Sequence, residues 1–361
     1  MITTGHYVGG RLVAGGEPVT DVHDPATGER IGRVPGAPPD LVEEAVAAAV
    51  AAADGWAATS LAERAEYVDR WRDKIVAESD TLLETTIDEL GLPPAFARAV
   101  HVGRAGNCLV GLADLASTVL TPRTEAHSLV VREPAGVLAA ITAWNFPLHQ
   151  LIAKVAGGLI MGNTVVAKPS EVKPLAAWRV TELLSELGLP PGVVNVVGGT
   201  GELVGAPLVA HRDVDVISFT GSRETGRSIL AAAAPTITRS VLELGGKSAA
   251  LVLPDADLDA ALDGVLGSCL FNNGQVCGAQ SRLVVHRDQL PEIEERVRAR
   301  LDAVVVGPPR AAGTTLGPVV SAAQRERVAG FIEYGVRSGL RVLAGGTGRP
   351  AGVPEGGYYV R

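Results

Sequence analysis

The stretch Val137-Leu138-Ala139-Ala140-Ile141-Thr142 decides how the chain folds, because it carries no charge, no glycine and no proline. A strand with one buried face alternates apolar and polar residues, whereas a strand buried on both faces is apolar throughout. Such strands lie inside parallel sheets that helices cover on either side. We therefore predict a buried parallel strand at residues 137–142.

Similar apolar runs follow, and helical stretches separate most of them. Further strands are predicted at residues 163–168, 193–197, 214–219, 238–242 and 249–253. Helices are predicted at residues 148–161, 174–188, 201–211, 223–233 and 257–272. This alternation predicts an α/β fold with a parallel sheet and right-handed crossovers, whose ligands bind beyond the carboxyl ends of the strands.

The first third of the chain lacks this alternation of apolar strands and helices. Residues 1–40 are rich in Gly, Pro and Asp and predict short strands and turns. Four helices are then predicted, at residues 39–58 (with Asp40 as the N-cap), 61–78, 79–90 and 95–117. A short strand is predicted at residues 128–132. We expect the four helices to form a layer around the sheet.

The composition excludes several classes of function. The 361 residues suffice for two or three domains, and the net charge of −8 is spread along the chain. This balance argues against a nucleic-acid or membrane-surface partner. The three cysteines, Cys108, Cys269 and Cys277, form no CxxC pair, so neither a disulfide framework nor a metal site is predicted. We expect a reducing, cytoplasmic location.

Two segments bear on targeting. Residues 134–153 are uncharged but contain Asn145, His149, Gln150 and two prolines, which are costly in lipid, so a strand, a loop and a buried helix are predicted there. The first residues show no basic region followed by an apolar run, so we expect no signal peptide.

Polar residues follow the first two central strands. Asn145, in Ala143-Trp144-Asn145-Phe146-Pro147, is placed to donate to a developing oxyanion, and the alternative is a tight turn with aromatic packing. In Lys168-Pro169-Ser170-Glu171, the lysine and the glutamate could hold ribose hydroxyls. The alternative there is a solvated helix start capped by Ser170.

Two glycine-bearing junctions follow the next two strands, at residues 198–205 and 220–226. Backbone N–H groups and a helix N-terminus can hold phosphate at such junctions. Neither matches the G-x-G-x-x-G pattern. Gly246-Lys247-Ser248 resembles the end of a P-loop, but Val241 replaces the required glycine, so we reject that interpretation.

The last two motifs pair a thiol with a carboxylate. Cys277 ends Phe271-Asn272-Asn273-Gly274-Gln275-Val276-Cys277, and Glu243 lies in Leu242-Glu243-Leu244-Gly245-Gly246-Lys247. They suggest a nucleophile and a general base. The alternative is that Cys277 is a small core residue, as many cysteines are.

Taken together, and in this order, the motifs resemble those of the NAD(P)-dependent aldehyde dehydrogenase superfamily over nearly the whole chain. The resemblance implies a Rossmann-like parallel-sheet NAD-binding domain of residues 1–116 and 133–244. It also implies a small β-arm for oligomerisation at residues 117–132, and a second, incomplete α/β catalytic domain at residues 245–361.

The same resemblance assigns roles. Cys277 would attack the aldehyde as a thiolate, the Asn145 amide and the Cys277 N–H would hold the oxyanion, and Glu243 would activate the water that hydrolyses the thioester. The product would be a carboxylate. Val276 and Gly278, beside the cysteine, are small and uncharged, which favours a neutral aldehyde.

The implied cofactor is NAD. Lys168 and Glu171 would hold the adenosine ribose, and Glu171 favours NAD over NADP because a carboxylate accepts a 2′-hydroxyl and repels a 2′-phosphate. Ser222 and the start of its helix would face the pyrophosphate. The other implied cofactor residues are Thr142, Trp144, Ser170, Gly201, Gly205, Phe219, Thr220, Gly221, Thr225 and Leu244.

The chain departs from the family at its end. It stops at Arg361, where members of the family continue into a Glu-x-Phe-Gly-Pro segment and a last strand that pairs with a neighbouring subunit. We therefore expect a C-terminally truncated member, forming a homodimer or homotetramer if a full-length chain exists. The alternatives are a non-catalytic dinucleotide-binding or assembly remnant, and an esterase that uses Cys277 and Glu243.

Overall fold

The computed structural model describes residues 2–38 and 40–361, which form two compact units. Unit 1 takes the chain up to Val22, Gly32–Thr85 and Arg98–Leu244. Unit 2 takes His23–Ile31, Thr86–Ala97 and Gly245–Arg361. Two short N-terminal stretches thus fold with the second unit, which a division in chain order does not anticipate. The nucleotide-binding and catalytic roles of the two domains stay predictions.

Unit 1 is built on a sheet with the strand order β12-β11-β8-β9-β10-β2-β3. Its five parallel strands are β8 (Val137–Ile141), β9 (Thr164–Lys168), β10 (Val194–Val196), β11 (Val216–Gly221) and β12 (Arg239–Leu244). Two antiparallel strands extend it, β2 (His6–Val8) and β3 (Arg11–Val13). The predicted parallel sheet is confirmed for the first five predicted strands, whereas the sixth, at residues 249–253, belongs to a separate sheet in unit 2.

The strand order reverses beside β8. From β8 the chain runs outward through β9 and β10, then returns to the other side of β8 as β11 and β12. Ile141 pairs with Phe219, so the segments that leave β8 and β11 start side by side. The carboxyl edge at such a reversal is where open α/β sheets bind ligands.

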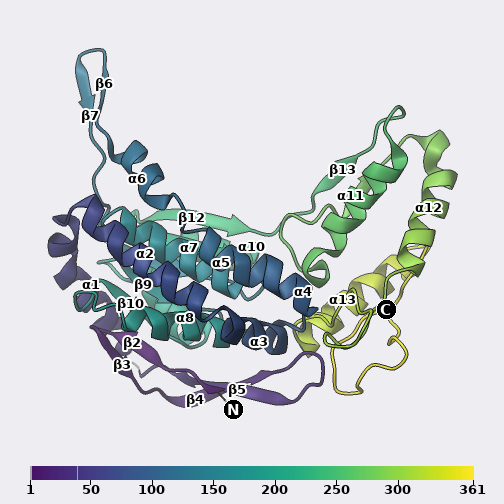
Figure 1. Ribbon diagram of the computed structural model, residues 1–361, viewed down its shortest axis with the longest axis horizontal. Coiled ribbons are helices and arrows are strands. Elements are labelled where there is room, and N and C mark those ends of the chain that lie inside the picture. The colour runs from purple at the N-terminus through teal and green to yellow at the C-terminus, as the bar shows by residue number, and fades with distance from the viewer. Residues whose placement is uncertain (1, 39) are drawn as a thin grey trace. The chain divides into compact units, whose positions relative to one another are not determined.

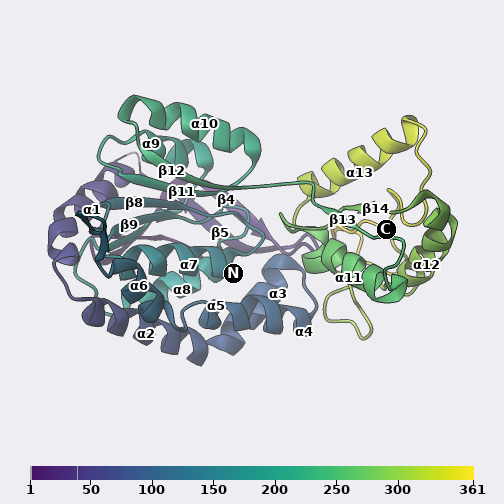
Figure 2. The ribbon, with the colours of Figure 1, turned by 90° about the horizontal axis from the view of Figure 1, so that it is seen from above.

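Helices cover both faces of this sheet (Figures 1 and 2). On one face, α1 (Leu41–Ala57) packs on the central strands with α9 (Ala206–Ala210) and α10 (Arg223–Ala233). On the other lie α7 (Pro147–Ile160) and α8 (Leu175–Ser185), covered by α2 (Leu61–Ala77). Of the four helices predicted to surround the sheet, α1 packs on the strands and α2 covers α7 and α8.

One predicted helix is wrong, and one predicted N-cap lacks its capping hydrogen bond. The predicted helix at 95–117 is broken into α4 (Pro94–Phe96), η1 (Ala97–Val102), α5 (Gly103–Asn107) and α6 (Leu112–Leu120). Gly111 has a φ of 73°, a left-handed conformation that ends a right-handed helix and suits glycine. Asp40 takes the predicted N-cap position of α1, but its backbone is already helical (φ −88°, ψ −4°) and its side chain makes no capping hydrogen bond.

Smaller elements complete unit 1. The helix predicted at 201–211 begins as a π-helical turn, η2 (Gly201–Gly205). A hairpin of β6 (Arg123–Glu125) and β7 (Ser128–Val130) follows α6 and is largely exposed (Figure 1). The predicted arm at 117–132 therefore overlaps the end of α6. Two further parts extend into unit 2. One is α3 (Ser79–Leu90), whose residues from Thr86 on belong to unit 2. The other is a separate sheet of β1 (Ile2–Thr3), β5 (Arg30–Gly36) and β4 (Gly16–His23), in which residues 23, 30 and 31 belong to unit 2.

Unit 2 contains a two-stranded parallel sheet and three longer helices. The strands are β13 (Ala249–Leu251) and β14 (Arg282–Val284). The helices are α11 (Leu258–Leu270), α12 (Leu290–Asp302) and α13 (Ala322–Arg337), with short turns η4 (Phe271–Gly274) and η5 (Arg287–Gln289). Across both units, the described residues include no helix that is both long and apolar enough to span a membrane.

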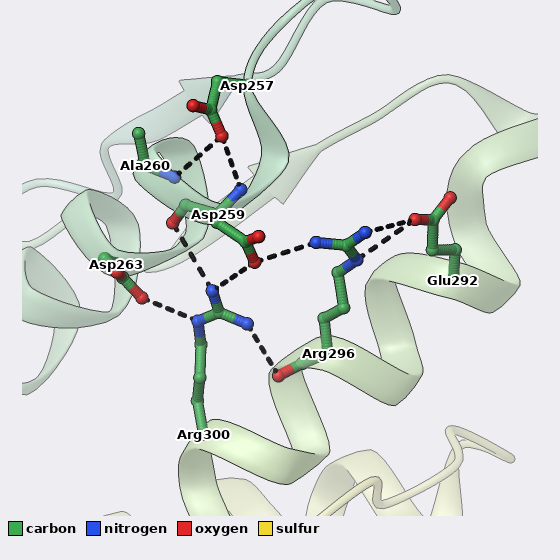
Figure 3. A network of polar contacts seen from close by, with 7 residues as sticks. All are labelled: Asp257, Asp259, Ala260, Asp263, Glu292, Arg296 and Arg300. Carbon is green, nitrogen blue, oxygen red and sulfur yellow. Dashed lines mark hydrogen bonds and ion pairs between the residues drawn. The ribbon is translucent and has the colours of Figure 1, made fainter.

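Ion pairs join α11 to α12 (Figure 3). Arg296 and Arg300 of α12 both reach a carboxylate oxygen of Asp259, at 2.8 and 2.7 Å, and Arg300 also binds Asp263 at 2.7 Å. Hydrogen bonds from Arg300 and Arg296 lower the pKa of Asp259. Exposed pairs are individually weak, but here two guanidinium groups share one carboxylate. The network orients α11, which leads directly into the turn before Cys277.

Candidate functional site

Asn145 lies in the loop between β8 and α7, in contact with the first turns of that helix. Its Oδ1 accepts a hydrogen bond from Gln150 Nε2 at 3.0 Å. Gln150 Oε1 in turn accepts the Ala143 N–H at 2.7 Å. The amide that the sequence singles out is therefore held by side-chain and backbone contacts within unit 1, rather than projecting from a loose turn.

Lys168 and Glu171 form an ion pair at the end of β9, with 2.8 Å between Nζ and Oε2. The Gly201 N–H donates to the other carboxylate oxygen at 3.3 Å, so η2 is tied to the same group. Burial works against ionisation of Glu171, but the charge and hydrogen bonds of Lys168 outweigh it and lower the pKa of this carboxyl. Ser170 is buried, and its hydroxyl accepts the Val172 N–H.

Three of the predicted glycines stand where a side chain would meet neighbouring atoms. A Cβ at Gly221 would lie 2.3 Å from the Phe219 ring, and one at Gly226 would lie 2.9 Å from Leu244. A Cβ at Gly205 would contact the Lys168 side chain at 3.6 Å. Gly226 therefore lets α10 approach β12 closely, whereas the contact at Gly205 would be an ordinary one and that at Gly221 lies within β11 itself.

Ser222 caps α10. Its hydroxyl accepts the Thr225 N–H at 3.1 Å and lies 2.9 Å from the Thr225 hydroxyl. The two residues are thus brought together, as their common assignment predicts. Thr220 and Gly221 on β11 pair with Glu243 and Leu244 on β12.

A cleft opens beside Glu171 at the carboxyl ends of β9 and β10. Besides Ser170 and Glu171, it is lined by residues that the sequence does not assign to a site, including Trp178, Pro174, Thr4 and Gly5. Gly198 and Gly199, which begin the first predicted phosphate junction, also line the cleft. Thr142 is buried at the end of β8, where its N–H donates to Lys168 O.

Lys154 is a residue that the motifs miss. It lies on α7, and its Nζ is 2.7 Å from the Ser218 hydroxyl of β11. Burial lowers the pKa of Lys154 to about 8, against the opposing effect of the negative charge of Glu243. Lys154 is the only Lys, Arg, Asp or Glu within residues 147–160, a signal available in the sequence. Glu243 itself is exposed on β12.

Cys277 follows a turn of unusual backbone conformation. Asn272, Asn273 and Gly274 have φ values of 55°, 55° and 75° in succession. Left-handed backbone is unfavourable for residues with a side chain, and Asn tolerates it better than most. Such conformations persist where surrounding contacts impose them, often at functional sites.

Two side chains, those of Asn273 and Gln275, hold this turn against the rest of unit 2. Asn273 Nδ2 donates to Gly91 O at 3.1 Å and to Pro318 O at 3.0 Å, and Asn273 Oδ1 accepts the Gly317 N–H at 2.9 Å. Gln275 Oε1 accepts the Val320 N–H at 2.9 Å. The turn is therefore anchored to two separate segments of unit 2, at Gly91 and at residues 317–320.

The three cysteines differ in accessibility. Cys277 is exposed, whereas Cys108 and Cys269 are partly buried. Burial raises the pKa of Cys108 to about 11 and also raises that of Cys269, which Lys247 partly offsets. A Cβ at Gly246 would lie 3.6 Å from the Cys277 carbonyl oxygen, so the segment that follows Glu243 reaches the backbone of the cysteine.

Each unit thus carries part of the predicted site. Asn145, Glu243 and the predicted cofactor residues belong to unit 1, and Cys277 belongs to unit 2. The catalytic roles of these three residues stay predictions. No group of three His, Cys, Asp or Glu side chains placed to hold a metal ion occurs within residues 2–38 and 40–361.

Comparison with known proteins places the chain in a family. The model of the aldehyde dehydrogenase family matches residues 13–361. A 3-succinoylsemialdehyde-pyridine dehydrogenase from a Pseudomonas species is 39% identical over 360 residues, which are 98% of this chain and 75% of that protein.

Solved structures agree. Aldehyde dehydrogenase C (AldC) from Pseudomonas syringae, a cysteine-to-alanine mutant in complex with NAD+ and octanal, has a TM-score of 0.95 and 39% identity, covering 99% of this chain and 74% of that one. The NAD+ complex of an aldehyde dehydrogenase from Bacillus cereus has a TM-score of 0.93 and 33% identity, with coverage of 99% and 74%. The chain spans about three-quarters of the length of these relatives and belongs to the aldehyde dehydrogenase family of oxidoreductases.

Proposed function

We propose that the chain oxidises an aldehyde to a carboxylate with NAD+, using Cys277 as the nucleophile. The observation that carries the proposal is an exposed Cys277 on an anchored turn, in a chain whose other two cysteines are partly buried. A catalytic thiol must be reached by its substrate and must ionise, and burial in apolar surroundings opposes both.

The residues of unit 1 fit a dinucleotide. Glu171, ionised at neutral pH, is suited to accept the ribose 2′-hydroxyl, and Ser222 lies at the N-terminus of α10, where a pyrophosphate would be favoured. The NAD+ complexes of AldC and of the Bacillus cereus enzyme support this choice of cofactor. Bound there, NAD+ would supply the acceptor for the hydride that leaves the substrate.

The protein residues would do the rest of the chemistry. The thiolate of Cys277 forms a bond to the carbonyl carbon, and the oxyanion that results accepts hydrogen bonds from the Asn145 amide and the Cys277 N–H. Once the hydride has left, a thioester remains on Cys277. Glu243 then takes a proton from the attacking water, and the carboxylate product leaves with regeneration of the thiolate.

The substrate class follows from the surroundings of the cysteine. Val276 and Gly278 are small and uncharged, which favours a neutral aldehyde. Octanal, bound to AldC, is therefore a suitable first probe. The homo-oligomeric state, with the exposed β6–β7 hairpin as its contact, and the cytoplasmic location stay predictions.

The test is turnover of octanal with NAD+, followed by NADH absorbance. We expect activity in the wild type and in Cys269→Ala, and none in Cys277→Ala. Full activity of Cys277→Ala would contradict the assignment of the nucleophile. A wild-type chain that binds NAD+ but turns over neither octanal nor shorter aldehydes would instead be a dinucleotide-binding remnant.

A further inference from the structure

The side chain of Gln150 connects the loop backbone after β8 to the Asn145 amide. Gln150 Oε1 accepts the Ala143 N–H at 2.7 Å, and Gln150 Nε2 donates to Asn145 Oδ1 at 3.0 Å. All three residues lie in unit 1, within the β8–α7 loop and the start of α7.

This connection determines how both amides are oriented. A backbone N–H can only donate, so the end of the Gln150 amide that meets Ala143 must be its oxygen. The NH2 end of Gln150 therefore faces Asn145, and a donor there requires the oxygen of Asn145. The NH2 group of Asn145 is consequently at the end of its amide turned away from Gln150.

We propose that Gln150 is a positioning residue, which keeps the Asn145 amide turned so that its NH2 group, and not its oxygen, meets the oxyanion. The inference rests on the proposed function of Asn145. An amide turned the other way would present lone pairs to an anion. Loss of a single oxyanion donor lowers kcat by about 10²–10³-fold.

A purely structural role for Gln150 would be to tie down the loop through Ala143. Gln150→Glu separates the two roles, because a carboxylate still accepts the Ala143 N–H but cannot donate to Asn145 Oδ1. In this variant the Asn145 amide is expected to turn over and donate to the new carboxylate. Gln150→Leu loses both hydrogen bonds and places no carboxylate beside the Asn145 amide.

The kinetic expectation is specific. Gln150→Glu should lower kcat for octanal by about 10²-fold, with KM and NAD+ affinity within about twofold of the wild type, because an oxyanion donor acts in the transition state. In an Asn145→Ala background the same substitution should change kcat by less than about twofold. Gln150→Leu should lower kcat less, by about tenfold, since no carboxylate then draws the NH2 group of Asn145 away from the oxyanion. Gln324→Glu on α13 is the control for the added charge and should keep the wild-type rate.

Two kinetic outcomes would overturn the inference. One is a Gln150→Glu variant with the wild-type kcat. The other is an equal loss of kcat with and without Asn145, which would show that charge or folding, and not the orientation of the amide, causes the effect.

A second readout needs no turnover. In protein labelled with ¹⁵N-asparagine, the side-chain amide signals of Asn145 are those missing from Asn145→Ala. They should shift in Gln150→Glu and stay in place in Gln324→Glu. Unchanged Asn145 signals in Gln150→Glu would refute the inference, whereas absence of NADH formation by the wild type would refute the proposed function alone.

Discussion

Lys168 and Glu171 lie 2.8 Å apart at the end of β9, with the ammonium buried and the carboxylate partly exposed. Burial of Glu171 alone would raise its pKa, but the neighbouring Lys168 and the Gly201 N–H bring the pKa below its ordinary value. An ionised carboxylate is therefore held rigidly between β9 and η2. In the proposed function, this charge favours NAD over NADP.

Replacing that charge should change the choice of cofactor. Glu171→Gln removes the repulsion of a 2′-phosphate and should raise the affinity for NADP relative to NAD by about tenfold, or about 1.4 kcal/mol. The two dissociation constants, measured by titration of the protein, give the ratio. Glu202→Gln, an exposed glutamate on η2, is the matched control. An unchanged ratio in Glu171→Gln would show that the carboxylate does not face the ribose.

The two half-reactions should separate in Glu243→Gln. An amide cannot take a proton from the attacking water, so thioester hydrolysis should slow by about 10²-fold or more. Oxidation of the first equivalent of aldehyde should persist, giving a burst of NADH followed by a slow steady state in stopped-flow absorbance. If the burst disappears, Glu243 acts before the thioester forms, and its role in hydrolysis is wrong.

The three cysteines should differ in their rate of alkylation. Iodoacetamide reacts with thiolates, and Cys108, with a pKa of about 11, is almost wholly protonated at pH 7. We expect the exposed Cys277 to be modified first and Cys108 last, as followed by mass spectrometry of peptides. The denatured chain, in which all three should react alike, is the control. Modification of Cys108 before Cys277 would contradict this order.

Lys154 should make stability depend on pH. Its pKa is about 8 in the folded chain, below the ordinary value of 10.5, so the folded state binds its proton more weakly than the unfolded state does. The destabilisation is complete below pH 8 and vanishes as the pH rises toward 10.5. The free energy of unfolding of Lys154→Met minus that of the wild type should therefore fall as the pH rises through this interval.

Chemical denaturation of both proteins between neutral pH and pH 10.5 measures this difference. Lys74→Met removes an exposed lysine that is paired with Glu186, and it should not show the trend. A stability difference between Lys154→Met and the wild type that stays constant with pH would show that burial does not affect the charge of Lys154.

The sequence predicts the sheet well because a strand that is buried on both faces is apolar throughout, and such a run is visible in the sequence. Residues 137–142 and the runs after them are apolar throughout, and they form β8 to β12 with small changes at their ends. The order of the strands in the sheet is not visible in the composition of the strands. The contact of Lys154 with Ser218 depends on β11 lying beside β8, so the motifs alone do not reveal it.

The sequence-based predictions fail where the outcome depends on the backbone conformation of single residues. Asp40 is a residue type that commonly caps helices, but capping needs extended backbone, and Asp40 is already helical. Gly111 is visible in the sequence, yet only its φ shows that it interrupts the predicted helix. Likewise, Gln150 lies five residues from Asn145, a spacing that indicates no contact until the loop between β8 and α7 is known.

The division of unit 2 into separate stretches of chain has a consequence for biosynthesis. Pro25 accepts the Tyr358 N–H at 2.8 Å, and Gly91 accepts the Asn273 amide at 3.1 Å. At about 5–20 residues per second, the ribosome releases Pro25 some tens of seconds before Tyr358. Unit 2 therefore cannot complete its fold until Tyr358 has been synthesised, and a recombinant fragment that begins at Gly245 would lack two of its own segments.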